Sequence, residues 1–131
     1  MVTEFLEGED LAQRLGREGT VHVGDALAIV VEVLKALAEA HSIGLVHRDL
    51  KPHNVFYEEG YVKIGDYSLC KMMSTSHRTG HTMTVGTVHY MAPEISEGRY
   101  DAGVDIYALG VILFEMLTGT PPFVGDSIGE V

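Results

Sequence analysis

The chain has 131 residues, 46% of them hydrophobic and 21% charged, which suits one globular domain and excludes a disordered or fibrous protein. Nine basic and nineteen acidic side chains give a formal net charge of −10, so neither nucleic acid nor an anionic membrane is expected as a partner. The single cysteine, Cys70, excludes an internal disulfide and fits a cytoplasmic location, and no apolar stretch approaches the roughly 20 residues that span a bilayer.

Two helices are predicted in the first third of the chain. Between residues 25 and 41, apolar residues recur at steps of three and four, which puts them on one face of a helix. These residues are Leu27, Val30, Val31, Leu34, Leu37 and Ala38. Gly44 is expected to end this helix. A shorter helix is predicted over about residues 10–15, with Gly16 ending it.

A β-hairpin and a long loop are predicted to follow. Residues 55–57 and 61–64 are β-prone, and Gly60 between them supplies the positive φ that a tight turn needs. Residues 68–84 are rich in Ser, Thr, His and Gly without periodicity. A segment of this length and composition indicates a surface loop of the kind that is usually functional.

A second long helix is predicted over residues 104–117, which are apolar on nearly every side. That pattern is typical of a helix buried all round. Gly119 and the prolines after it are expected to end the helix. The fold class predicted from these elements is α+β, mainly helical, with one short hairpin.

The residues with the clearest chemistry lie between the second helix and the hairpin, in the stretch H-R-D-L-K-P-H-N at 47–54. It places a carboxylate, an ammonium and a carboxamide close together on one loop. Phosphoryl transfer needs such a set: a base for the attacking hydroxyl, a cation for the γ-phosphate and an oxygen ligand for a hard divalent metal.

This stretch resembles the catalytic loop of the protein kinase family, H-R-D-L-x-x-x-N. Further landmarks follow in the family's order. Residues 66–68 (D-Y-S) stand where the family has D-F-G, and residues 86–94 end in the Ala-Pro-Glu that closes its activation segment. Residues 105–110 look like the start of the central helix of the large lobe, and residues 119–123 like the loop after it.

By this resemblance the chain is identified as part of a eukaryotic-type protein serine/threonine kinase. Residues 1–131 are expected to run from the hinge through the loop after the central buried helix, with the small lobe and the C-terminal helices missing. A membrane anchor could then lie only elsewhere in the parent protein. Lys51 and Thr87 point to the serine/threonine branch, and residues 37–41 and 120–123 resemble bacterial members of the family.

The resemblance implies catalytic roles residue by residue. Asp49 would accept the proton of the substrate hydroxyl, and Lys51 would steady the transferring phosphoryl group. Thr87 would help to form the pocket for the acceptor. Asn54 and Asp66 would hold the Mg²⁺ ions that bridge the ATP phosphates, and both offer the oxygen ligands that Mg²⁺ requires.

The first residues resemble the hinge that binds the nucleotide. Backbone groups of Glu4 and Leu6 would meet the adenine edge, and Asp10 would reach the ribose hydroxyls. Phe56 in the hairpin would form part of the adenine floor. The cofactors implied are ATP and Mg²⁺, and the partners implied are protein substrates.

Arg48, directly before the catalytic aspartate, implies regulation. In kinases with this arginine, a phosphate on the activation loop supplies the anion that the guanidinium grips bidentately. Thr82 and Thr84 are the preferred positions for that phosphate. His47 is expected to pack against Tyr67 and to be tied to Asp105 rather than to bind a metal.

One departure from the family pattern keeps a second hypothesis open. Ser68 stands where D-F-G has glycine and lacks its φ freedom, so a pseudokinase or an ATP-binding interaction module is the alternative to an enzyme. The glycine-rich loop and the V-A-I-K lysine of the family are not found in the sequence. Residues 1–131 alone are therefore expected to have negligible kinase activity, and to dimerise through exposed apolar surface.

Overall fold

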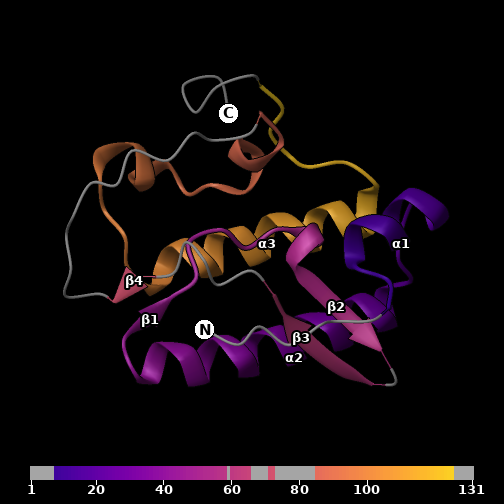
Figure 1. The fold of residues 1–131 in the computed structure, drawn as a ribbon. Coiled ribbons are helices and arrows are strands. Elements are labelled where there is room, and N and C mark those ends of the chain that lie inside the picture. The colour runs from indigo at the N-terminus through magenta and orange to yellow at the C-terminus, as the bar shows by residue number, and fades with distance from the viewer. Residues whose placement is uncertain (1–7, 59, 66–70, 73–84, 126–131) are drawn as a thin grey trace.

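The computed structural model describes residues 8–58, 60–65, 71–72 and 85–125. Two long helices, α2 (Val23–Ser42) and α3 (Ala102–Thr118), pack against each other and form the body of the fold (Figure 1). The other elements are α1 (Leu11–Glu18), strands β1 (Leu45–Val46), β2 (Val55–Glu58), β3 (Tyr61–Ile64) and β4 (Lys71–Met72), and the 3₁₀ helices η1 (Pro52–Asn54), η3 (Val85–Tyr90) and η4 (Pro93–Glu97). The mainly helical α+β class is the one predicted.

Helix α2 confirms that residues 25–41 are helical and extends the helix at both ends. The apolar face named from the sequence is not the buried one, because Leu27, Val31 and Leu34 are 52%, 49% and 41% exposed. The prediction missed the first turn because His22 is an unusual cap: its Nδ1 accepts a hydrogen bond of 3.2 Å from the backbone N–H of Gly24. Gly44, with φ of 80°, ends the helix as expected, since glycine tolerates this left-handed conformation. The residues buried on its inner face are Ala26, Ile29, Val33 and Leu37.

Helix α3 is capped at both ends, and of the two caps only Gly119 was predicted. Asp101 accepts a hydrogen bond of 2.8 Å from the backbone N–H of Gly103, and Gly119 ends the helix with φ of 91°. The prediction that this helix is buried all round is wrong for one of its sides. Ile106 and Phe114 are 47% and 44% exposed, because α2, η3 and η4 cover only part of the helix surface. No helix in the described ranges is long and apolar enough to cross a bilayer.

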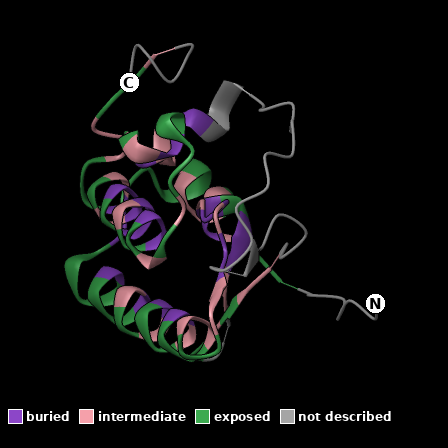
Figure 2. Cartoon of the chain, turned by 90° about the vertical axis from the view of Figure 1, so that its left-hand side faces the viewer, coloured by how far each residue is buried: buried purple, intermediate pink, exposed green. Residues whose placement is uncertain are grey.

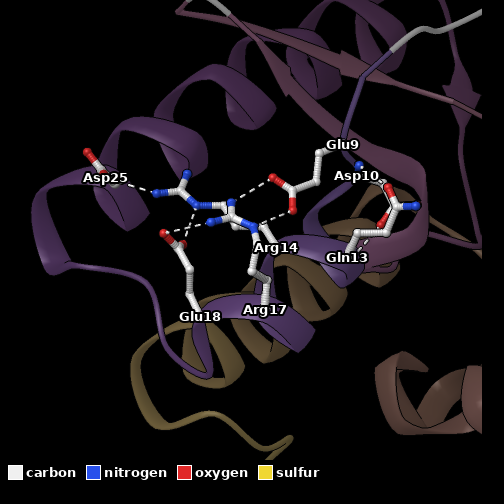
Figure 3. Close-up of polar contacts among 7 residues, drawn as sticks. All are labelled: Glu9, Asp10, Gln13, Arg14, Arg17, Glu18 and Asp25. Atoms are coloured by element: carbon white, nitrogen blue, oxygen red, sulfur yellow. Dashed lines mark hydrogen bonds and ion pairs between the residues drawn. The ribbon is translucent and has the colours of Figure 1, made fainter.

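Helix α1 does not end at Gly16 as predicted but continues to Glu18 and is capped by Gly19. A glycine inside an exposed helix costs only about 1 kcal/mol, and ion pairs along the helix oppose that cost (Figure 3). Arg14 pairs with Glu18 at 2.7 Å and with Asp25 at 3.0 Å. A further pair joins Arg17 to Glu9 at 2.8 Å, and its hydrogen bond lowers the pKa of Glu9.

The hairpin is confirmed, and a second strand pair was missed. Gly60 has φ of 82° between β2 and β3, which pair antiparallel. Strand β4 lies within the predicted loop 68–84 and pairs antiparallel with β1, Val46 opposite Lys71. A two-residue strand has no alternation that sequence could reveal, so only its partner defines it.

Two hydrophobic clusters hold the segment that follows β1. The larger one lies between α2 and α3 and includes Leu50 and Val55, and the smaller one includes Val46 and Val104. In Figure 2 the buried residues of the long helices gather on their inner sides and the exposed ones on their outer sides. Since Val46 precedes residues 47–54 and Leu50 and Val55 lie within and after them, the core fixes this loop at both ends.

We predict that Gly119→Ala lowers the free energy of unfolding by about 1–3 kcal/mol, because an L-residue is strained in this conformation. The new Cβ would also lie 3.0 Å from the backbone oxygen of Gly19. Chemical denaturation measures the change. Gly16→Ala is the control: its Cβ meets nothing within 4 Å, so stability should rise by up to about 1 kcal/mol. Equal stability of the two variants would contradict this account of the α3 terminus.

Candidate active site

The structure brings together two of the predicted catalytic residues and one predicted metal ligand. Asp49 is 7% exposed, and the Nζ atom of Lys51 lies 3.5 Å from its Oδ2. Asn54, on η1, donates a hydrogen bond of 2.6 Å from Nδ2 to the backbone oxygen of Asp49. The loop therefore closes on itself, with the carboxylate, the ammonium and the carboxamide at one place.

The other carboxylate oxygen of Asp49 distinguishes this site from an ordinary ion pair. Oδ1 is buried and has no hydrogen-bond partner among the described residues. A buried carboxylate oxygen without a donor is costly. Oδ1 is therefore suited to receive a hydrogen bond, and then a proton, from a hydroxyl group brought to the site.

The ring of His47 fixes the loop from inside. Its Nδ1 accepts a hydrogen bond of 3.1 Å from the backbone N–H of Asp49, so this nitrogen carries no proton. Its Nε2 lies 2.9 Å from the backbone oxygen of Gly65 and must be the donor there. The imidazole is thus neutral with the proton on Nε2, which supports the expectation that it is structural. Its expected packing partner Tyr67 lies outside the described residues.

The carboxylate of Asp105 on α3 is 1% exposed and connects three parts of the chain. Its Oδ2 accepts hydrogen bonds of 2.9 Å from the backbone N–H of His47 and 2.8 Å from Nε2 of His41. Its Oδ1 accepts one of 2.9 Å from the backbone N–H of Arg48. The expected tie between His47 and Asp105 is confirmed, through the main chain. His41 was missed, because no spacing rule relates it to a residue 64 positions later.

Arg48 combines a strained backbone with unpaired charge. Its φ is 72°, the one positive value at a non-glycine residue in the described ranges, and strain of this kind persists only where the surroundings enforce it. Its guanidinium lies over the ring of Tyr100, 3.6 Å from the centroid. Nε and Nη1 are buried without a hydrogen-bond partner among the described residues. Two buried cationic donors without an acceptor fit an anion-binding role.

Asn54 is oriented to offer oxygen to a cation. Because its Nδ2 is used by the backbone oxygen of Asp49, its Oδ1 is left for a ligand, and amide oxygen is a donor that Mg²⁺ accepts. Asp66, the second predicted ligand, lies outside the described residues. Within the described ranges no three His, Cys, Asp or Glu side chains form a metal cluster. Of the two predicted metal ligands, Asn54 is therefore the one that the structure describes, and the orientation of its amide suits metal binding.

Two of the predicted nucleotide contacts are neighbours. Asp10 and Phe56 form an isolated antiparallel bridge. Asp10 also caps α1: its Oδ1 accepts from the N–H of Gln13 at 2.8 Å, and its own N–H donates to Oε1 of Gln13 at 2.9 Å (Figure 3). Glu4 and Leu6 lie outside the described residues. Asp10 and Phe56, the residues predicted to contact the ribose and the adenine, therefore lie side by side in the fold.

The remaining predicted residues stay predictions. Thr87 lies in η3, but its side chain is not among those described. Thr82 and Thr84 lie outside the described residues. Near Thr87, the hydroxyl of Tyr90 donates a hydrogen bond of 2.5 Å to Oε2 of Glu115 and so holds η3 against α3. Burial, with a smaller contribution from the Glu115 carboxylate, raises the pKa of Tyr90 well above its ordinary value.

The known proteins that this chain is similar to are protein kinases. A family model described as the protein kinase domain matches residues 1–130. Among the curated relatives are a probable serine/threonine-protein kinase PknB of Lactococcus lactis, 43% identical over 130 residues, and the serine/threonine-protein kinase PrkC of Bacillus subtilis, 39% identical over 129 residues. Each match covers 97% of this chain but only 21% and 20% of the relative. The chain thus spans about a fifth of the length of these relatives.

We predict that Asp105→Asn lowers the free energy of unfolding by about 2–4 kcal/mol, because an amide nitrogen would replace one of two oxygens that each accept a hydrogen bond. Thermal or chemical denaturation measures the loss. Asp101→Asn is the matched control on the same helix. It should change stability by less than about 0.5 kcal/mol, since Asn and Asp cap helices equally well. Similar losses in both variants would show that Asp105 has no special role.

We predict that Tyr90→Phe lowers the free energy of unfolding by about 1 kcal/mol near neutral pH, the contribution of one hydrogen bond. Because folding raises the pKa of Tyr90, the neutral hydroxyl stabilises the folded protein. This contribution is fully present at pH values below the pKa of tyrosine in the unfolded chain. The contribution is lost as pH rises above about 10. Denaturation of both proteins between pH 7 and 11 should show the difference shrinking at the alkaline end. Tyr61→Phe, at a 74% exposed position, should match the wild type throughout; a pH-independent effect at Tyr90 would refute the assignment.

Proposed function

This chain belongs to the protein kinase family, and from that premise we propose that the protein is a serine/threonine kinase that transfers the ATP γ-phosphate to Ser or Thr hydroxyls of proteins. The relatives PknB and PrkC carry serine/threonine-protein kinase in their names. The observation on which the proposal mainly rests is the buried Oδ1 of Asp49, which has no hydrogen-bond partner among the described residues.

Asp49 and Lys51 share the chemical step. The hydroxyl oxygen of the substrate bonds to the γ-phosphorus, the bond from phosphorus to the leaving ADP oxygen breaks, and Oδ1 of Asp49 takes the hydroxyl proton. Lys51 lies 3.5 Å from the other oxygen of the same carboxylate. It orients Asp49 and presents positive charge to the phosphoryl group, whose oxygens carry the negative charge in the transition state.

ATP and Mg²⁺ are the cofactors of the proposed reaction. Asn54, through its Oδ1, and Asp66 would be the metal ligands, and the amide orientation set by the bond to the Asp49 backbone supports the first of these. Held by these two residues, the ion would supply positive charge close to the nucleotide phosphates. Glu4 and Leu6 would bind the adenine edge through their backbones.

Three further residues complete the proposed substrate contacts. Asp10 would bind the ribose through the carboxylate that also caps α1. Phe56, its bridge partner, would lie under the adenine ring. Thr87, in the 3₁₀ helix η3, would help to form the pocket for the protein hydroxyl. The proposed partners are therefore protein substrates rather than small molecules.

Arg48 is the proposed regulatory residue. A phosphate on Thr82 or Thr84 would supply the acceptor that Nε and Nη1 of Arg48 lack among the described residues. A phosphate carries nearly two negative charges and three acceptor oxygens, so it can bind a guanidinium bidentately and order the loop that bears it. We expect phosphopeptide mapping of the active protein to find phosphate on Thr82 or Thr84, and a loop modified at neither would contradict this role.

A second candidate function, a pseudokinase or an ATP-binding interaction module, is favoured by one observation, the serine at position 68 in place of the D-F-G glycine. The two functions differ in whether Asp49 is needed for turnover. A pseudokinase would retain Asp49 without using it. An enzyme would depend on it for the proton transfer.

We predict that Asp49→Asn in the full-length protein lowers kcat by about 10²–10⁴, the usual contribution of a general base, while the Kd for ATP changes little. Phosphate transfer from labelled ATP to a protein substrate measures kcat, and equilibrium binding measures Kd. Asp101→Asn, at the cap of α3 and with no proposed part in the chemistry, should retain wild-type kcat. Equal transfer by the wild type and Asp49→Asn would favour the non-catalytic function.

A further inference from the structure

The aromatic face beneath Arg48 belongs to a residue that sequence analysis did not single out. The guanidinium carbon of Arg48 lies 3.6 Å from the centroid of the Tyr100 ring. Tyr100 directly precedes Asp101, the N-cap of α3, and packs against the smaller hydrophobic cluster. Its ring is therefore supported from behind by the core and presents its face to the cation.

The side chain of Arg48 is consequently held at both ends. Its backbone N–H is bound by Oδ1 of Asp105 at 2.9 Å, with φ of 72°, and its guanidinium rests on Tyr100. A free arginine side chain has many rotamers, and ordering it costs conformational entropy each time it binds a ligand. An arginine that is already ordered loses less on binding.

Stacking of this kind leaves the hydrogen-bonding capacity of the cation intact. The N–H groups of a guanidinium lie in its plane, whereas an aromatic ring contacts its face. The geometry agrees with this division, since Nε and Nη1 are buried but have no hydrogen-bond partner among the described residues. The contact with Tyr100 thus fixes the plane of the guanidinium without using its donors.

We propose that Tyr100 is a positioning residue, whose ring holds the Arg48 guanidinium ready for a phosphate on the activation loop. The inference rests on the proposed role of Arg48 and deepens it. Tyr100 does not touch the phosphate or the reacting atoms. It acts through Arg48: because the Arg48 side chain is already ordered, less conformational entropy is lost when the loop phosphate binds.

The smaller cluster offers a matched control. Tyr107, on α3, also packs half-buried against that cluster, but within the described ranges it takes part in no cation–π pair. A substitution of Tyr107 removes a similar area of aromatic surface from the same cluster without touching the cation. A purely structural role for Tyr100 would therefore give the two positions similar behaviour.

The test compares the full-length protein with phosphate on its activation loop and the same protein after phosphatase treatment, and measures the ratio of the two kcat values. Tyr100→Phe keeps the aromatic face and should retain the wild-type ratio within about twofold. Tyr100→Leu should lower the ratio roughly fivefold or more. Tyr107→Leu should leave it unchanged, and Arg48→Ala should reduce it to about one.

A second series tests the same contact without removing the ring. Phenylalanine with increasing numbers of fluorine atoms at position 100 keeps the size of the ring and progressively weakens its attraction for a cation. The activation ratio should fall stepwise along this series. This result remains available even if Tyr100→Leu does not fold.

The outcomes separate the inference from the role on which it rests. If Arg48→Ala abolishes activation while Tyr100→Leu and the fluorinated series retain it, Tyr100 is not a positioning residue and the role of Arg48 stands. If Tyr107→Leu loses activation as Tyr100→Leu does, the effect belongs to the cluster and the inference is overturned. If Arg48→Ala is activated like the wild type, or the wild type is not activated at all, the regulatory role of Arg48 fails and the inference fails with it.

Discussion

The hydrogen bonds to the buried carboxylate of Asp105 are the constraint on which the rest of the site depends. A charge that is 1% exposed is tolerated only when its oxygens are satisfied, and here the donors are the backbone N–H groups of His47 and Arg48 and the ring of His41. Satisfying Asp105 therefore dictates the path of the loop. The positive φ of Arg48 is the local strain that this path entails, and the carboxylate offsets it.

From this anchor the functional groups follow in order along a few residues of chain. The His47 ring binds the N–H of Asp49, and the amide of Asn54 binds its backbone oxygen, so the backbone of Asp49, the proposed base, is held from both sides. Lys51 meets the carboxylate itself. Arg48 points instead to Tyr100, so the residue proposed to bind the regulatory phosphate is directed away from the residues proposed to transfer phosphate. Both groups are held by the same loop, which Asp105 on α3 anchors.

The sequence alone allowed the long helices, the hairpin and the set Asp49, Lys51 and Asn54 to be predicted, because each depends on local periodicity or on a short motif. What it could not predict depends on contacts between distant segments. The bond from His41 to Asp105, the pairing of β1 with β4 and the stacking of Tyr100 join residues that no spacing rule relates. The continuation of α1 past Gly16 was missed for a similar reason, since ion pairs outweighed the preference of glycine for a helix end.

The central claim is that Asp49, Lys51, Asn54 and Asp66 converge on metal-bound nucleotide phosphates around a loop held by Asp105. A crystal structure of the full-length protein with Mg²⁺ and a non-hydrolysable ATP analogue tests it most directly. The account predicts Oδ1 of Asn54 and the Asp66 carboxylate on the metal, Lys51 at the γ-phosphate, and the Asp105 hydrogen bonds intact. Phosphates bound elsewhere, with these side chains directed to unrelated surfaces, would contradict it.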